Sequence, residues 1–352
     1  MTAPAAPLLD PARLGTWLDG LGLAQGEPID HTPLSGGKSN AMFTIRRGEH
    51  AWVLRRPAGV AIARAEDGLR REFRILTALA DTPVPHPRAV AFCEDRDVLG
   101  SAFYLMARVE GFAPFPEAIP ANFGAADAPS DAPSDAPSDS APGSPPESAP
   151  GREIGLAMAD TLADLHALDP QTIGLGDLGR PDGFHERQVS RWMKQLSGYP
   201  ESGTLPGVEV VTAWLEKNLP PAFTPVLMHG DYHFGNVLLA PEPPPRVTAI
   251  VDWETATIGD PLLDLAGFLR IWFETGPSEG SSWDEMATRY ATRAGLPELP
   301  DLTYYITLSR FRLAVLLEGI HQRAKSDPTR DPQPGIGTYA RRLITDAVES
   351  LR

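Results

Sequence analysis

The residues best suited to chemistry lie in one short stretch of the chain. Asp231 and Asn236 stand five positions apart within His229–Asn236, and Asp252 follows sixteen positions later. Phosphoryl transfer requires a hydroxyl aligned on the γ-phosphorus and cations that neutralise the charge developing there. We therefore predict that Asp231 orients and deprotonates an attacking hydroxyl, while Asn236 and Asp252 hold Mg²⁺ on a nucleoside triphosphate. Each acid alone would fit a turn residue or a helix cap, but the combination indicates phosphoryl transfer.

The elements that must position these residues fall into two groups. In the first 110 residues we expect a helix at 8–23, an alternating stretch after a glycine turn at 34–43, strands at 51–56, 88–93 and 103–109, and a helix at 62–80. The first helix would place Leu14, Trp17, Leu18 and Leu21 on one face. The second group is mostly helical, with helices at 154–168, 302–325 and 336–351 and a hairpin of strands 237–240 and 247–251. This hairpin delivers Asp252 directly after its second strand. The fold class is therefore α+β, with an N-terminal lobe (1–110) of antiparallel sheet plus helix and a mostly helical C-terminal lobe (151–352).

Residues 111–150 differ in kind from both lobes. Asp127, Asp131, Asp135 and Asp139 recur every four residues in a repeated Asp-Ala-Pro-Ser unit, and the segment 121–150 has almost no large apolar side chains. Such a segment cannot offset its ordering entropy by burial. We predict a disordered acidic insert that serves as a tether, with a docking segment for a specific partner as the alternative.

The charge and cysteine content exclude several classes of protein. The chain carries 31 Lys and Arg against 46 Asp and Glu, a net charge of −15, which argues against nucleic acid or an anionic membrane as the main partner. The single cysteine, Cys93, excludes internal disulfides and thiolate metal clusters and fits a reducing cytoplasm. No signal peptide is visible, and no apolar stretch approaches the roughly 20 residues that span a bilayer. We expect a cytoplasmic protein whose partners are a nucleotide and a small-molecule acceptor; no feature indicates an oligomeric state.

Several motifs resemble one branch of the protein-kinase-like fold. The loop His229–Asn236 has the kinase spacing D-x-x-x-x-N. Together with Ile250–Glu254 and Gly259–Ala266 it resembles the aminoglycoside phosphotransferase-like branch, which implies a bilobal fold, ATP as co-substrate and Mg²⁺ as cofactor. The runs Gly174–Pro181 and Glu186–Gln195 resemble the subgroup whose kinase domain is fused to acyl-CoA dehydrogenases in some eukaryotes. The resemblance covers nearly the whole chain apart from the insert.

The resemblance implies a nucleotide site in the N-terminal lobe. The residues that match its phosphate-covering loop are Gly36, Gly37, Ser39 and Asn40. Arg55 stands where a kinase has its phosphate-binding Lys, and Glu72 stands where the partner glutamate does. The change to Arg keeps the cation, with Arg56 as an alternative phosphate contact and a surface ion pair as the alternative for Arg55–Glu72. The hinge residues Met106, Arg108 and Val109 are expected to meet the adenine through their backbone.

Three residues around the loop are expected to be structural. The resemblance implies that His229 supports the catalytic loop. Trp253 is expected to pack beneath the metal site. Asp260 precedes Pro261, so it can cap the helix that begins there.

The acceptor site is expected in the C-terminal lobe. Arg187, Arg191 and Gln195 recur at helical spacing, with Trp192, Lys194 and His185 close by, and form a basic stripe in an acidic chain. The stripe is either a solvated helix face or an anion-binding wall beside the acceptor hydroxyl. His233 in the loop and Glu254 after the metal-binding acid are further candidates for acceptor contacts. The subgroup resemblance implies a hydroxy acid or a hydroxyacyl-CoA as acceptor.

Three other functions stay open. An aminoglycoside or amino-alcohol kinase would need carboxylates around its cationic substrate, and the basic stripe argues against it. A pseudokinase that only binds nucleotide would have no need of Asp231, Asn236 and Asp252 together. A protein kinase would need D-F-G and A-P-E motifs and an activation loop, for which the short segment between Asp252 and Gly259 leaves no room. The sequence does not choose between ATP and GTP.

Overall fold

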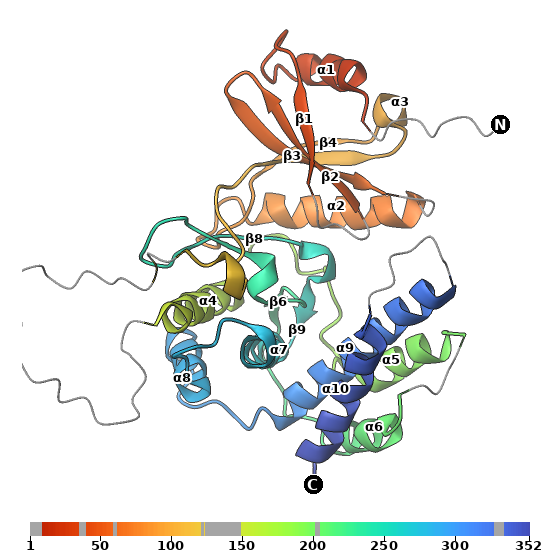
Figure 1. Ribbon diagram of the computed structural model, residues 1–352, viewed down its shortest axis with the longest axis vertical. Coiled ribbons are helices and arrows are strands. Elements are labelled where there is room, and N and C mark those ends of the chain that lie inside the picture. Colours follow the sequence, from red (N-terminus) through yellow and green to blue (C-terminus); the bar gives the residue numbers. More distant parts are fainter. Residues whose placement is uncertain are drawn as a thin grey trace, which may run out of the picture. The chain divides into compact units, whose positions relative to one another are not determined.

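The computed structural model describes residues 9–34, 40–58, 62–120, 123, 149–200, 205–326 and 334–352. The chain divides into two compact units (Figure 1). Unit 1 comprises Met1–Pro114 with Gly235–Thr255, and unit 2 comprises Phe115–Phe234 with Ala256–Arg352. Within the described ranges, no helix combines the length and the apolar character needed to traverse a lipid bilayer.

Unit 1 is built on a five-stranded antiparallel sheet. In sheet order its strands are β1 (Asp30–Leu34), β2 (Asn40–Arg47), β3 (His50–Pro57), β5 (Phe103–Ala107) and β4 (Ala89–Cys93). Its helices are α1 (Pro11–Gly20), α2 (Ile62–Ala78) and the short α3 (Arg96–Leu99). Neighbouring residues of a strand point to opposite faces of a sheet. On β5, Phe103 meets Trp17 of α1 and Tyr104 meets Phe73 of α2, so the two helices cover opposite faces.

The expected order of strands and helices in this unit is confirmed, with two differences. β1 forms an additional edge strand that the sequence analysis did not predict, paired with β2 from Asp30–Arg46 to Leu34–Met42. The first helix ends at Gly20, and Leu21, expected on its apolar face, is 49% exposed. Leu14 and Leu18 are fully buried, as the pattern predicts.

A hairpin of β7 (Val237–Leu239) and β8 (Val247–Ile250) also belongs to unit 1. Phe112 forms a β-bridge with Leu239, so this part of the expected insert 111–150 has a defined place against the hairpin. A Cβ atom on Gly111 would lie 2.6 Å from the carbonyl oxygen of Leu239, and only glycine permits this approach. Residues 121–122 and 124–148 of the expected insert lie outside the described residues.

Unit 2 is mostly helical, as predicted. Its helices are α4 (Pro150–His166), α5 (Gln188–Ser197), α6 (Val208–Lys217), α7 (Pro261–Thr275), α8 (Trp283–Arg293), α9 (Thr303–Ser326) and α10 (Ile336–Ser350). Two short strands, β6 (Val226–Met228) and β9 (Thr257–Gly259), pair antiparallel. Short 3-10 turns lie at η1 (Pro116–Ala118), η3 (Phe234–Asn236) and η4 (Trp253–Thr255), the last of these in unit 1. The helix expected to begin at Ile154 begins four residues earlier, at Pro150.

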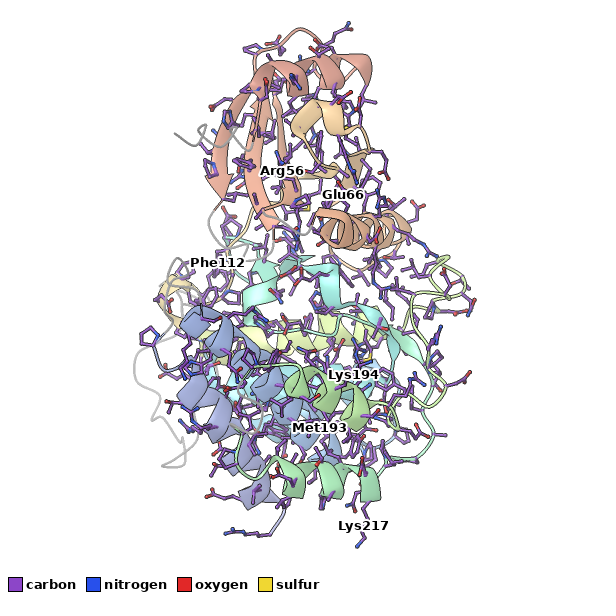
Figure 2. All side chains as sticks on the ribbon, turned by 90° about the vertical axis from the view of Figure 1, so that its right-hand side faces the viewer. Arg56, Glu66, Phe112, Met193, Lys194 and Lys217 are labelled. Carbon is purple, nitrogen blue, oxygen red and sulfur yellow. The ribbon has the colours of Figure 1, made fainter. Side chains whose placement is uncertain are left out.

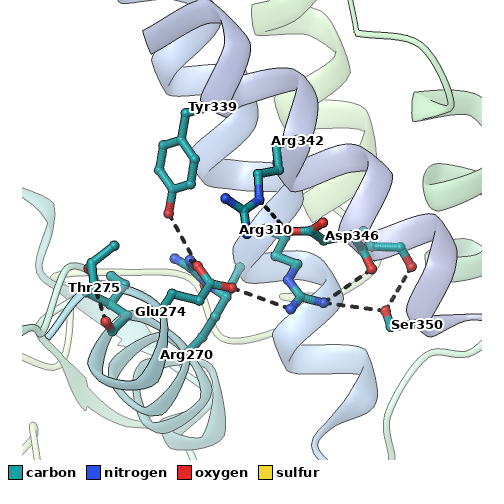
Figure 3. Close-up of polar contacts among 11 residues, drawn as sticks. Arg270, Glu274, Thr275, Arg310, Tyr339, Arg342, Asp346 and Ser350 are labelled. Atoms are coloured by element: carbon teal, nitrogen blue, oxygen red, sulfur yellow. Dashed lines mark hydrogen bonds and ion pairs between the residues drawn. The ribbon is translucent and has the colours of Figure 1, made fainter. Parts of the chain in front are cut away.

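The long helix α9 is the centre of unit 2, because α5, α6, α7 and α10 all pack against it. A polar network fastens α7 to α9 and α10 (Figure 3). Glu274 of α7 accepts hydrogen bonds from Arg270 at 2.6 Å, from Arg310 of α9 at 3.4 Å and from the hydroxyl of Tyr339 of α10 at 3.3 Å. Three partners from three helices therefore converge on one carboxylate. The α+β architecture, with a sheet unit and a helical unit, agrees with the prediction.

Candidate active site

The loop that carries Asp231 begins in unit 2, where α7 holds its backbone. The carboxylate of Asp264, in the first turn of α7, accepts the backbone N–H of His229 at 2.6 Å and that of Gly230 at 2.9 Å. Gly230 has φ +82°, a conformation that side chains disfavour. His229 is fully buried, and its Nδ1 lies 3.3 Å from the backbone N–H of Asp231. His229 thus supports the loop from within, as expected.

One further contact fixes the loop to α4, and His166 lies against Asp264. The buried hydroxyl of Tyr232 donates to the carbonyl of Met158 on α4 at 2.9 Å. His166 lies 3.5 Å from Asp264 through Nε2 and 2.8 Å from the hydroxyl of Tyr290 through Nδ1. Tyr232 and Asp264 thus hold the loop from the side of α4 and α7.

Asp231 is the exposed acid of the loop. Its side chain is 52% exposed, and its Oδ2 lies 3.7 Å from Nε2 of His233, an ion pair when the imidazole is protonated. Desolvation alone would raise the pKa of Asp231, but His233, His229 and Arg312 together hold that pKa below its ordinary value. Asp231 is therefore ionised at neutral pH and can accept a proton.

In unit 1, Arg55 of β3 is the centre of a group of acids. Its Nη1 donates to Glu72 of α2 at 2.8 Å, and its Nη2 donates to Asp252 at 2.9 Å and to Glu254 at 3.4 Å. The amide of Asn40, oriented with its oxygen toward the guanidinium, accepts from Nη2 and Nε at 3.1 Å. The side chains of Arg55 and Glu72 are only 8% and 3% exposed, so the surface ion pair considered as an alternative is wrong.

The charge states in this group are set by burial and by mutual attraction. Burial would lower the pKa of Arg55, but Glu72 and Asp252 raise it above its ordinary value. Burial raises the pKa of Glu72, and Arg55 acts in the opposite direction. Arg56 points to the other face of the strand, and burial lowers its pKa. Of the two arginines, Arg55 is the one placed beside Asp252.

The hairpin β7–β8 brings the two expected metal ligands to the same end. Asn236 directly precedes β7 and Asp252 follows β8, and the carbonyl of Asn236 accepts the N–H of Val251 at 2.9 Å. Asp252 has φ +64°, which is uncommon for a residue other than glycine and is held by its surroundings. Trp253 is buried beside it and donates from Nε1 to the carbonyl of Ile250 at 2.9 Å.

The donor chemistry of this hairpin end fits Mg²⁺. A carboxylate and an amide supply the oxygen ligands that Mg²⁺ prefers, and magnesium usually takes one or two protein ligands together with substrate phosphates. Among the residues that the structure describes, no group of three His, Cys, Asp or Glu side chains forms a complete metal cage. The arrangement therefore suits a cation that is shared with a nucleotide.

The remaining nucleotide-site candidates occupy different positions. Gly36, Gly37 and Ser39 lie outside the described residues. Met106 is buried in β5, and Arg108 follows it with its backbone N–H bonded to the carbonyl of Ala51 at 3.2 Å and its side chain paired with Glu110. Val109 is the next residue along this connection. An adenine-binding role for these three residues stays a prediction.

The basic stripe around α5 is less uniform than its spacing indicates. Arg187 precedes the helix, and its guanidinium donates to the carbonyls of Asp182 and Arg180 in its own loop. Lys194 is exposed on α5 (Figure 2). Gln195 donates to the hydroxyl of Tyr199 at 2.9 Å. A place for His185 beside the stripe is wrong: it is buried and lies 2.9 Å from Asp260, which also caps α7 by accepting the N–H of Leu262 at 3.0 Å. The cap role expected for Asp260 is confirmed.

A small pocket beside Asp231 is the feature that the sequence analysis missed. Its volume is about 60 Å³. The lining residues come from the loop, α7 and α9: Gly230, Asp231, Tyr232, Leu263, Asp264, Gly267, Arg270, Ile271, Ser309, Arg312, Leu313 and Leu316. Arg312 stands far from the loop in sequence, and its Nη2 lies 3.4 Å from the carbonyl of Gly230. No motif spacing connects Arg312 with Asp231, so only the packing of α9 reveals it.

The chain is similar to proteins of known family and fold. A family model described as "Phosphotransferase enzyme family" matches residues 30–126 and 137–302. Acyl-CoA dehydrogenase family member 11 of Mus musculus is 32% identical over 328 residues, a match that covers 89% of this chain but only 39% of that protein. A solved candidate aminoglycoside phosphotransferase from Ralstonia eutropha is 28% identical, with a TM-score of 0.77 and coverage of 97% of this chain and 98% of that one. The GDP complex of an aminoglycoside 2'-phosphotransferase-IIIa shares the fold, with a TM-score of 0.61 at 15% identity and coverage of 97% and 100%.

Proposed function

The chain belongs to the phosphotransferase enzyme family and has the fold of the aminoglycoside phosphotransferases, and on that premise we propose that it transfers the γ-phosphate of ATP to a hydroxyl of a small molecule. The observation that carries this proposal is Asp231, which is exposed and ionised on a loop whose backbone is held by Asp264. A general base must be ionised and within reach of the hydroxyl proton, and an ionised, exposed Asp231 meets the first condition and permits the second.

The residues divide the work as follows. As the acceptor oxygen bonds to the γ-phosphorus, its proton passes to Asp231, and the bond from the γ-phosphorus to the bridging oxygen breaks, so that ADP leaves. Asn236 and Asp252 are the residues that would hold Mg²⁺, which, when bound, neutralises charge on the phosphates. Arg55 offers the nucleotide a cation whose own position is fixed by Glu72.

For the acceptor we propose a hydroxylated acyl compound, either a hydroxy acid or its coenzyme A ester. Support comes from the relative named acyl-CoA dehydrogenase family member 11 and from Arg312, a cation that lines the pocket beside Asp231. A polycationic aminoglycoside would meet repulsion from Arg312, which argues against the alternative of an aminoglycoside kinase.

The test is a screen for ADP release and phosphorylated product. The purified chain is incubated with Mg²⁺ and ATP, or GTP in parallel, and with hydroxy acids, their coenzyme A esters, amino alcohols and kanamycin. We expect product with the hydroxy acids or their esters and a loss of at least about a hundredfold in turnover for Asp231→Asn. Equal turnover by Asp231→Asn, or phosphorylation of kanamycin alone, would contradict the assignment.

A further inference from the structure

We propose that the pocket beside Asp231 binds an anionic group of the acceptor through Arg312, and that the ring of Trp192 positions the guanidinium for this contact. The proposal rests on the phosphotransferase function proposed above and assigns the acceptor subsite to α9 and α5. Arg312 and the pocket residues named here all belong to unit 2.

Arg312 lies beside the loop that carries Asp231. Its Nη2 lies 3.4 Å from the carbonyl of Gly230, the residue directly before Asp231. A ligand that contacts this guanidinium therefore lies near Asp231, the base that must receive the hydroxyl proton. Arg312 is well placed to orient the acceptor, because a planar guanidinium can bind a carboxylate or a phosphate through two parallel hydrogen bonds.

The two arginines of the pocket differ in their partners. Arg270 is buried, and its charge is balanced by Glu274, to which it donates at 2.6 Å (Figure 3). It also donates to the hydroxyl of Ser309 at 3.2 Å. In the described part of the chain, Arg312 has no such ion pair, and the bond to Gly230 is the hydrogen bond it makes. Burial lowers the pKa of Arg312, while Asp264 and Asp231 act in the opposite direction. A ligand anion would give this guanidinium the partner that Glu274 gives to Arg270.

The guanidinium of Arg312 lies over the indole of Trp192. The guanidinium carbon of Arg312 lies 5.4 Å from the centre of the Trp192 ring, and that of Arg191 lies 5.6 Å from it. Trp192 is buried, and its Nε1 donates to Gln188 at 3.2 Å, so the ring has a fixed orientation. The two guanidinium cations lie at one ring and repel each other. The chain as a whole carries a net charge of −15, so this pair of cations is a local exception. An anion beside Arg312 relieves this repulsion.

The rest of the pocket defines the body of the ligand. Leu263, Ile271, Leu313 and Leu316 supply an apolar wall next to the charged end. Leu316 is 41% exposed, so apolar surface remains for a ligand to cover. The ligand class is thus an alcohol with a short apolar body and one anionic group, and the anion is either a free carboxylate or a phosphate of a coenzyme A ester.

The experiment compares matched acceptors in the wild type and in variants. Acceptors are alkanoic acids of four to eight carbons with the hydroxyl at successive positions, their neutral carboxamides, and their coenzyme A esters. Variants are Arg312→Gln, Arg312→Lys, Trp192→Leu and Trp192→Phe. The surface variant Arg342→Gln is the matched control, because its side chain is 74% exposed and pairs only within α10 in the described structure. Thermal unfolding is recorded for every variant.

We expect Arg312→Gln to lose about tenfold to a hundredfold in kcat/KM for the anionic acceptor, chiefly through KM, and less than about threefold for the carboxamide. For Arg312→Lys, kcat/KM for the anionic acceptor should lie between the values of the wild type and Arg312→Gln. This variant provides the test if Arg312→Gln does not fold. Trp192→Phe keeps an aromatic face and should retain most of the preference for the anion, whereas Trp192→Leu should lose it. A preference for the free acid identifies the carboxylate as the anion, and a preference for the ester alone identifies a coenzyme A phosphate.

Equal losses on the acid and the carboxamide would overturn the proposal, because they would mean that Arg312 only supports the loop. A wild type without preference for the anionic member of any pair would overturn it as well. Phosphorylation of neutral or cationic alcohols alone would refute the subsite but leave the phosphotransferase function intact. Failure to phosphorylate any alcohol in the screen would instead refute the proposed function, and the subsite with it.

Discussion

The carboxylate of Asp264 accepts the backbone N–H of Gly230 at 2.9 Å, one residue before the proposed base. The same carboxylate accepts the N–H of His229 at 2.6 Å, so one side chain of α7 satisfies two loop donors. Hydrogen bonds to an ionised acceptor are stronger than neutral ones. The conformation of the loop that carries Asp231 therefore depends on a residue of α7.

We predict that Asp264→Asn destabilises the fold and slows turnover. An amide can accept at one side only, and its NH₂ group would face a backbone N–H, leaving a buried donor unsatisfied. The expected cost is about 1–3 kcal/mol in the free energy of unfolding, measured in urea, together with a fall in kcat. Asp284→Asn, at an exposed position in α8, is the control. Unchanged stability and kcat in Asp264→Asn would show that the loop holds its shape without this carboxylate.

The lowered pKa of Asp231 predicts the pH profile. A base with a depressed pKa is ionised above that pKa and loses activity only as the pH falls through it, here below the ordinary value of 3.8. We therefore expect kcat/KM, measured from about pH 5 to pH 8, to show no acid limb from Asp231. His233→Gln removes one of the groups that lower this pKa, so an acid limb should move upward in that variant. An acid limb near neutral pH that persists in His233→Gln would contradict the assignment of an ionised Asp231.

The buried pair Arg55–Glu72 predicts an asymmetric response to substitution. Arg55→Met leaves the carboxylate of Glu72 buried without its cation, and the expected loss is about 3–5 kcal/mol in the free energy of unfolding. Arg55→Lys keeps the charge but loses the fork whose two nitrogens meet Glu72 and Asp252, so a smaller loss is expected. Arg55→Met combined with Glu72→Leu should recover stability relative to Arg55→Met. Additive losses in this double-mutant cycle would mean that the two side chains are energetically independent.

Asp252 provides a test of the metal site that is separable from folding. Asp252→Asn retains a residue type that tolerates φ +64° but removes the charge, so the fold should be kept. We expect the Mg²⁺ concentration that supports half-maximal activity to rise by about tenfold or more, because a neutral amide is a poorer ligand for a hard cation. Glu254→Gln, next to Asp252 and also in contact with Arg55, is the comparison. A Mg²⁺ dependence identical to that of the wild type would remove Asp252 from the metal site.

The sequence alone determined the local chemistry and most of the elements. The spacing of Asp231, Asn236 and Asp252 identified the loop and the hairpin end, because these residues lie close together along the chain. Hydrophobic periodicity predicted the helices α1, α2, α4, α9 and α10 and most strands, since the 3.6- and 2-residue repeats depend only on neighbours in sequence. The helices α3, α6 and α8 were not predicted. The short strands β1, β6 and β9 were not predicted. The strands β7 and β8 are similarly short, but they flank a turn that marks them as a hairpin.

Only the tertiary structure decided which distant side chains meet. Three hydrogen bonds join residues that are far apart in sequence: His185 with Asp260, Gly230 with Asp264, and Arg312 with the carbonyl of Gly230. Spacing placed Arg187 on a basic stripe with His185 close by, yet the fold buries His185 and ties Arg187 to its own loop. A side chain's partner depends on which helices pack together, and that packing is a property of the whole core rather than of any local segment.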